Sequence, residues 1–185
     1  LALKNSKFRT MLLGLALMAG ANSVYISSAA EFVITVLGKD ETALGWLFIP
    51  LIAGTMLGSA VSSVFAQRIP TALQKKIGYA CLLTAGACNV LYNSLTSHPV
   101  VPWAVLPITL YTFGISQLMP ILTLETMGQF PKMRGLASSL QGFTQMMVFT
   151  LMSGLIVPHL FHSGLFLALA QTVTVLLGMA VYWLG

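Results

Sequence analysis

The stretch Met119–Gln145, MPILTLETMGQFPKMRGLASSLQGFTQ, holds one short charged loop between two long apolar runs. Its only charged residues are Glu125, Lys132 and Arg134. A loop of this kind between apolar segments lies at a membrane surface, and its two basic residues indicate the cytoplasmic side. The remaining segments of the chain can be placed by counting apolar runs outward from this loop.

The composition is that of an integral membrane protein. Of the 185 residues, 57% are hydrophobic and only 7% are charged, whereas a soluble domain has about 25% charged residues. The chain therefore lacks the polar surface that a soluble domain needs. Its net charge of +5 could indicate a nucleic-acid partner, but the basic residues are placed as a topology signal, so we expect no nucleic acid.

We expect an all-α polytopic membrane protein whose residues 1–185 form a single six-helix bundle. About 20 apolar residues cross a bilayer as a helix, and the charge-poor runs predict six spans, at residues 10–37, 42–66, 77–95, 102–124, 135–157 and 164–184. The first run is long for a straight crossing, so we expect it to be tilted or broken near Ser27 and Ser28. In the second run, Gly54 and Gly58 form a small-xxx-small pair that permits close helix contact.

The charges predict the orientation of these spans. Short loops that are rich in Lys and Arg stay in the cytoplasm. One side of the predicted bundle carries nearly all of the basic residues, namely Lys4, Lys7, Arg9, Arg68, Lys75, Lys76, Lys132 and Arg134. The other side carries Lys39, which Asp40 and Glu41 offset. Both ends of the chain are therefore predicted to be cytoplasmic.

The chain begins at Leu1 without an initiator Met and ends at Gly185 inside an apolar run. We therefore expect it to be an excerpt of a longer protein. Its first apolar run is too long for a signal peptide.

No catalytic or metal-binding motif is evident. The sequence has no G-x-S-x-G elbow and no P-loop. His159 and His162 share one predicted turn, but no third ligand accompanies them. We therefore expect a protein that is not an enzyme and has no cofactor and no bound metal.

Polar side chains inside the charge-free runs are the candidates for function. The amides are Asn22, Gln117, Gln141 and Gln145, with Tyr25 nearby. A buried amide without a partner costs several kcal/mol in lipid. Two interpretations stay open: these amides form hydrogen bonds between helices, or they line a substrate cavity together with Phe149.

Two carboxylates lie close to the predicted membrane. Glu125 is near Lys132 and Arg134, so a local ion pair that closes a gate is one interpretation and proton carriage is the other. Glu31 lies toward the outer end of the first run, and carboxylates inside membranes are functional candidates by default. Glu31, Glu125 and Arg134 are therefore the candidates for a proton or gating role.

Two motifs also carry a family resemblance. YISSA at Tyr25–Ala29 and FPxxxGxASSLxGxxQ at Phe130–Gln145 resemble signatures of the Bcr/CflA branch of drug:proton antiporters, in the major facilitator superfamily. The first resembles a signature of the seventh helix, and the second resembles that of the loop before the eleventh helix and of the helix itself. Ala30 and Arg134 depart from the branch's usual pattern.

The resemblance implies that the six spans are helices seven to twelve of a twelve-helix transporter. It implies a central cavity lined by the first, second, fourth and fifth spans, with the third and sixth spans outside. The implied function is proton-coupled efflux of drugs or small amphipathic compounds across the bacterial inner membrane. The implied partners are the small-molecule substrate, protons, the lipid bilayer and a missing N-terminal six-helix half. The alternatives are a superfamily exporter of a sugar, amino acid or other metabolite and, more remotely, a six-span scaffold or an intramembrane enzyme.

Overall fold

The computed structural model describes residues 6–38, 40–96, 100–160 and 163–184. The described chain consists of helices joined by short turns, without a strand. Within it, five helical segments are long and apolar enough to cross a membrane, at Ser6–Ser27, Gly45–Ala66, Leu106–Gly128, Pro131–His159 and Gly164–Trp183. The protein is therefore all-helical, with five candidate spans where the sequence predicted six.

The long helices follow one another in the predicted order. They are α1 (Ser6–Gly20), α4 (Gly45–Arg68), α5 (Thr71–Leu95), α6 (Leu106–Gly128), α7 (Arg134–Leu151) and α8 (Gly164–Trp183). The fourth predicted span begins at Leu106 and not at residue 102, since residues 101–105 form a turn and Pro107 takes the first-turn position that suits a proline.

The helix at the predicted third span, α5, is absent from the five candidates. Its 25 residues reach roughly 37 Å at helical rise, which is long enough to cross. The composition of α5 explains why it is not among the five candidates, because Lys75 and Lys76 lie in its first turns and Asn89 and Asn93 interrupt its apolar run.

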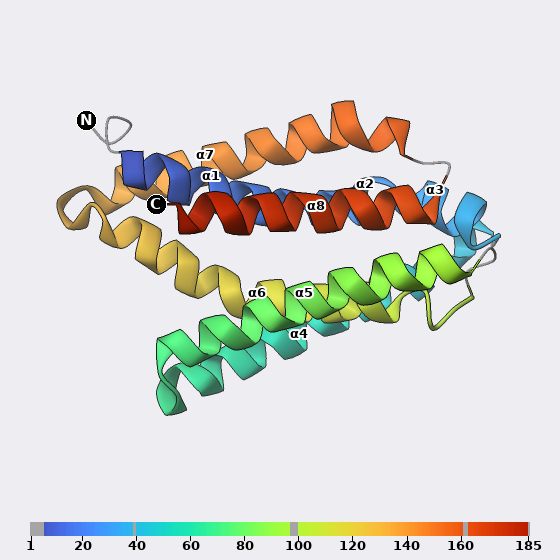
Figure 1. The fold of residues 1–185 in the computed structure, drawn as a ribbon, viewed down its shortest axis with the longest axis horizontal. Helices are drawn as coiled ribbons and strands as arrows, with labels where there is room; N and C mark the ends of the chain where they lie inside the picture. Colours follow the sequence, from blue (N-terminus) through green and yellow to red (C-terminus); the bar gives the residue numbers. More distant parts are fainter. Residues whose placement is uncertain (1–5, 39, 97–99, 161–162, 185) are drawn as a thin grey trace.

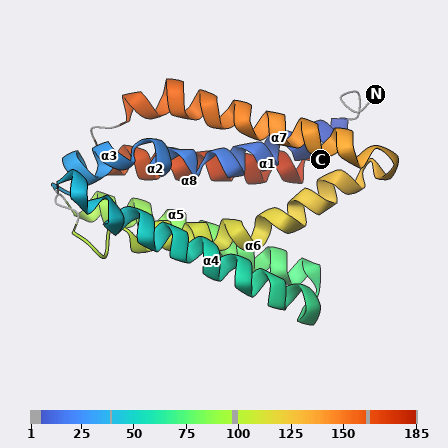
Figure 2. The same ribbon diagram turned by 180° about the vertical axis from the view of Figure 1, so that it is seen from behind.

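The helices form two groups of three, seen as two layers in Figures 1 and 2. In one group, α1 packs against α7 and α8, and in the other, α6 packs against α4 and α5. Contacts of α5 with α8 and of α1 with α6 join the groups. Exchanging α1, α4 and α5 with α6, α7 and α8, in that order, reproduces the four largest contacts between helices and the one between α1 and α6, but not the smaller contacts of α6 with α7 and of α4 with α5. The first three long helices and the last three are thus alike in their main packing.

Glycines allow the close contact between α4 and α6. A Cβ on Gly54 would collide with the carbonyl oxygen of Thr109, and a Cβ on Gly58 with that of Phe113. Hydrogen at these positions lets the two backbones approach each other. The prediction made from this glycine pair is confirmed.

The first span is broken, as predicted. After α1, the short helices α2 (Ser23–Ser27) and α3 (Ala29–Glu31) are separated at Ser28, and a π-helical turn follows at Phe32–Val36. A second interruption, at Ala21 and Asn22, was not predicted.

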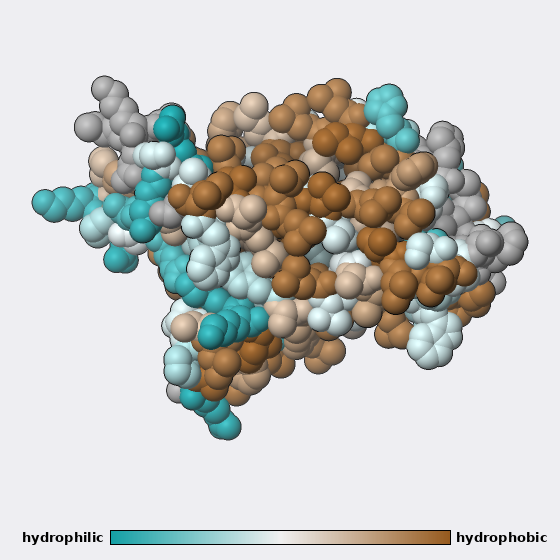
Figure 3. Space-filling model, viewed as in Figure 1, coloured by the Kyte–Doolittle hydropathy of each residue, from teal (hydrophilic) through white to brown (hydrophobic). Residues whose placement is uncertain are grey.

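The basic residues gather at one end of the bundle. The start of α1, the α4–α5 connection and the α6–α7 loop all lie at the left in Figure 1. They carry Lys7, Arg9, Arg68, Lys75, Lys76, Lys132 and Arg134. In Figure 3 this end is teal, and a brown apolar surface covers much of the face beside it. Lys4 and Lys39 lie outside the described residues.

Candidate functional site

Polar side chains accompany the interruption of the first span. The Asn22 backbone N–H donates to the Ala19 carbonyl at 3.2 Å, three residues back, and not to a residue four back. The Ser23 hydroxyl donates to the Gly20 carbonyl at 2.6 Å. Such side-chain bonds compete with the regular helical ladder. No proline is present there, so local polar chemistry accounts for the break.

An open pocket of about 480 Å³ lies beside this break. It is lined by residues of the first span, α4 and α6, namely Ala19, Asn22, Ser59, Ile115, Ser116, Met119, Pro120 and Thr123. Ala19 and Asn22 lie at the break that follows α1, whereas Ser59 and the α6 residues lie in the interior of their helices. The volume falls in the range of about 300–1,000 Å³ that is typical of small-molecule sites. Among the residues that the structure describes, the lining combines apolar side chains with one amide and three hydroxyls and contains no charged group.

Gln141 supports the rim of this pocket from α7. Its Nε2 donates to Oγ1 of Thr123 at 2.9 Å. Its Oε1 and Oδ1 of Asn22 are buried acceptors that have no hydrogen-bond partner among the described residues. Two of the predicted amides, Asn22 and Gln141, are therefore brought to one pocket, the first in its wall and the second behind it.

The other predicted cavity residues on α6 and α7 are not in the pocket wall. Gln117 is fully buried, with both polar atoms of its amide unpartnered in the described chain. Its backbone carbonyl accepts a hydrogen bond from Ser62 of α4 at 3.4 Å. Gln145 and Phe149 are half-buried on α7 and do not line the pocket.

Tyr25 lies in a separate polar cluster. Its buried hydroxyl accepts a hydrogen bond from Nδ2 of Asn89 at 2.8 Å, and the same Nδ2 lies 3.3 Å from Oε1 of Gln171. The Tyr25 ring meets Phe32 edge-on at 5.2 Å. This cluster joins α2, α5 and α8. Asn89 and Gln171 were not among the candidate residues predicted from the sequence. Each is an amide inside an apolar run, and this pattern could have identified them.

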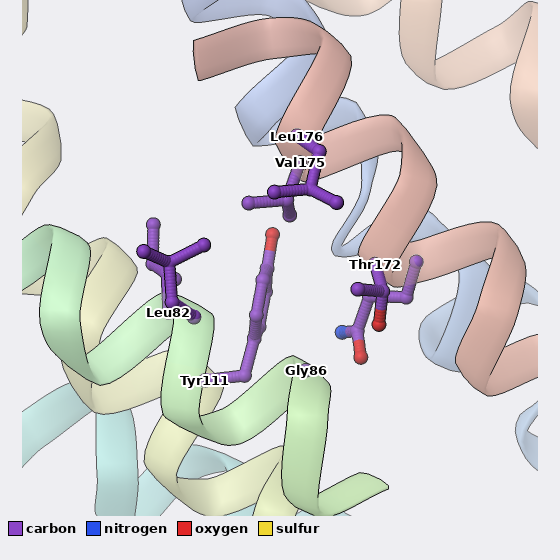
Figure 4. A pocket seen from close by; sticks show the side chains of 8 residues that line it. Leu82, Gly86, Tyr111, Thr172, Val175 and Leu176 are labelled. Atoms are coloured by element: carbon purple, nitrogen blue, oxygen red, sulfur yellow. The ribbon is translucent and has the colours of Figure 1, made fainter. Parts of the chain in front are cut away.

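A second, very small cavity of about 10 Å³ lies between α5, α6 and α8. Figure 4 shows the Tyr111 ring crossing it between Leu82 and Thr172. The Tyr111 hydroxyl donates to the Met18 carbonyl at 2.9 Å. This volume is about that of one water molecule, so the cavity cannot hold a substrate.

Glu125 is held at the basic end of the bundle by two other helices. Its Oε1 lies 2.6 Å from Nζ of Lys75 on α5, and its Oε2 accepts a hydrogen bond from the Tyr182 hydroxyl on α8 at 3.1 Å. One interpretation of the sequence paired Glu125 with Lys132 or Arg134 of the nearby loop. In the structure its partner is Lys75, which is distant in sequence. Arg134 is exposed at the start of α7, and Glu31 is half-buried at the end of α3.

The chemistry of the pocket favours binding. Its uncharged, mixed apolar and hydroxyl surface can hold a small amphipathic molecule. Comparison with known proteins finds no family model and no curated relative that matches this chain.

Proposed function

We propose that this chain is the C-terminal six-helix half of a major facilitator superfamily transporter, of the Bcr/CflA type. Its function is proton-coupled efflux of drugs or small amphipathic compounds. The observation that carries this proposal is the 480 Å³ pocket beside the break in the first span. Substrate sites of secondary transporters lie near the bilayer midplane, next to discontinuous helices.

The helix packing supports the same proposal. Three-helix units of opposite topology are typical of secondary transporters. Here α1 starts from the basic end and α6 from the other end (Figure 1), and the three-helix units that they begin make equivalent main contacts. The first three long helices (α1, α4 and α5) and the last three (α6, α7 and α8) are therefore candidates for an inverted repeat, although their sequences share no convincing identity.

The proposal requires α5 to cross the membrane as well, which brings the number of spans from five to six. The polar residues of α5 do not prevent it from crossing the membrane, because Gln74 and Asn89 are almost fully buried against other helices. Gln74 donates to the Ser62 hydroxyl at 2.9 Å, so its amide does not face lipid. With α5 included, both ends of the chain lie on the basic side, which we assign to the cytoplasm.

The coupling proton is assigned to the other half of the transporter. In this half, Glu125 is engaged by Lys75 and Tyr182, which favours a gating role at the cytoplasmic end. No charged residue in the described part of the chain lines the transport pocket. Glu31 on the first span is the alternative candidate for a proton role within this half.

The test is transport by this chain co-expressed with an N-terminal half, reconstituted in vesicles with an imposed pH gradient. Asn22→Leu should reduce proton-dependent efflux of the substrate by at least tenfold. Thr150→Val, on the exposed side of α7, is the matched control and should leave efflux unchanged. Equal efflux by both variants would remove the pocket from the mechanism. Uptake of sugars or amino acids in place of cationic drugs would favour the metabolite exporter.

A further inference from the structure

A second pocket lies at the basic end of the bundle, apart from the one proposed for transport. It has a volume of about 180 Å³ and lies where α1, α5 and α8 meet. Its wall is formed by two lysines, one methionine and three aromatic residues, namely Lys7, Met11, Lys75, Tyr79, Tyr182 and Trp183. The two pockets share no lining residue.

The position of this pocket is that of a membrane–water interface. Lys7 is in the first turn of α1, Lys75 is near the start of α5, and Trp183 is the last residue of α8. Trp183 is 73% exposed, and the centroid of its ring lies 6.3 Å from that of Tyr79. Tyr and Trp are enriched at the level of lipid headgroups. In Figure 3 the teal end meets the brown apolar face in this region.

The pocket has an excess of positive charge. Lys75 is neutralised in part by Glu125, whose Oε1 lies 2.6 Å from its Nζ. Lys7 forms no ion pair with any residue that the structure describes. One positive charge is therefore left over, and it favours an anion. The volume is below the roughly 300 Å³ of drug-sized sites, so the anion is a small group.

The surface that leads away from this pocket is apolar. The contact between α5 and α8 continues toward the middle of the bundle past the exposed side chains of Leu83 and Leu176. An acyl chain can lie along this surface while a charged group stays at the end of the bundle. A free inorganic ion would make no use of it.

We propose that this pocket binds the phosphodiester headgroup of an anionic phospholipid from the cytoplasmic leaflet. Lys7 and Lys75 contact the phosphate, and Trp183 and Tyr79 lie at the level of the glycerol. Basic pockets between membrane helices on the cytoplasmic side are suited to such headgroups. The proposal needs membrane insertion and orientation alone, so it stands whether or not the chain transports drugs.

The three tryptophans of the chain offer a direct test. Trp46 is at the start of α4 and Trp103 shortly precedes α6, and both helices begin at the end of the bundle opposite the basic residues (Figure 1). The variant Trp46→Phe/Trp103→Phe leaves Trp183 as the sole reporter. It is reconstituted in phosphatidylcholine vesicles that contain increasing fractions of brominated phosphatidylglycerol, whose bromines quench nearby tryptophan. Quenching should exceed the value for brominated phosphatidylcholine at equal mole fraction.

Lys7→Gln in this background should lower the preference for phosphatidylglycerol about fivefold, as expected for one basic residue near an anionic surface. Arg68→Gln is the control, because Arg68 is an exposed cation at the same end outside the pocket. Equal losses in both variants would mean general surface attraction and would overturn the proposal. Displacement of the lipid by millimolar inorganic phosphate would show a free-phosphate site and would also overturn it.

Discussion

Gly14 of α1 and Gly178 of α8 are in backbone contact. A Cβ on Gly14 would lie 2.6 Å from the Gly178 carbonyl oxygen, and a Cβ on Gly178 would lie 2.9 Å from that of Gly14. Both hindering atoms belong to the backbone and cannot rotate away. This contact sets how closely the first and last spans pack.

Gly14→Ala should destabilise the protein by about 1–3 kcal/mol, the usual range for overpacking. Gly142→Ala is the matched control, since a Cβ at Gly142 meets nothing within 4 Å. Thermal unfolding in detergent measures both variants. A Gly14→Ala protein as stable as the control would show that α1 and α8 can separate without cost.

Glu125→Gln should weaken the clamp between α5, α6 and α8, by about 1 kcal/mol for an ion pair that is partly exposed. The side chains of Lys75 and Glu125 are 27% and 35% exposed, so solvent screens them in part. The exchanged pair Lys75→Glu/Glu125→Lys should recover part of the stability that either single change loses. Arg134→Gln should leave the free energy of unfolding unchanged. A loss of stability as large as that of Glu125→Gln would indicate that the loop cations, and not Lys75 alone, pair with Glu125.

Tyr25→Phe should lower stability and leave the substrate profile unchanged. The change removes the acceptor for Asn89 and leaves a buried amide under-satisfied, at a cost of about 1–3 kcal/mol. Asn22→Ala should change the substrate profile and leave stability unchanged, because Asn22 lines the open pocket. Unfolding curves and drug-efflux profiles measured on both variants separate the two roles. A changed profile in Tyr25→Phe would place Tyr25 in the substrate path.

Orientation can be tested by labelling single cysteines in intact cells. Asp40 and Arg68 are exposed near opposite ends of the bundle, and the background lacks the two free thiols, Cys81 and Cys88. A membrane-impermeant reagent should label Asp40→Cys and not Arg68→Cys. Labelling of position 68 alone would invert the assignment made from the basic residues.

The sequence by itself determined the class of protein and the order of its helices. Apolar runs of helical length leave the backbone no other way to satisfy its hydrogen bonds in lipid. The short-range features were also readable: Gly54 and Gly58 mark a close contact, and Ser27 and Ser28 mark a break. Each depends on residues a few positions apart, so no knowledge of the packing was needed.

Only the tertiary structure decided which polar residues meet. Asn22 and Tyr25 are three residues apart, yet the break in the first span directs one to the pocket and the other to Asn89 on α5. The partner of Glu125 is 50 positions away, while the nearby Lys132 and Arg134 are exposed. Polarity within a span predicts that an amide or carboxylate needs a partner, but the partner depends on how the helices pack, which hydropathy does not encode.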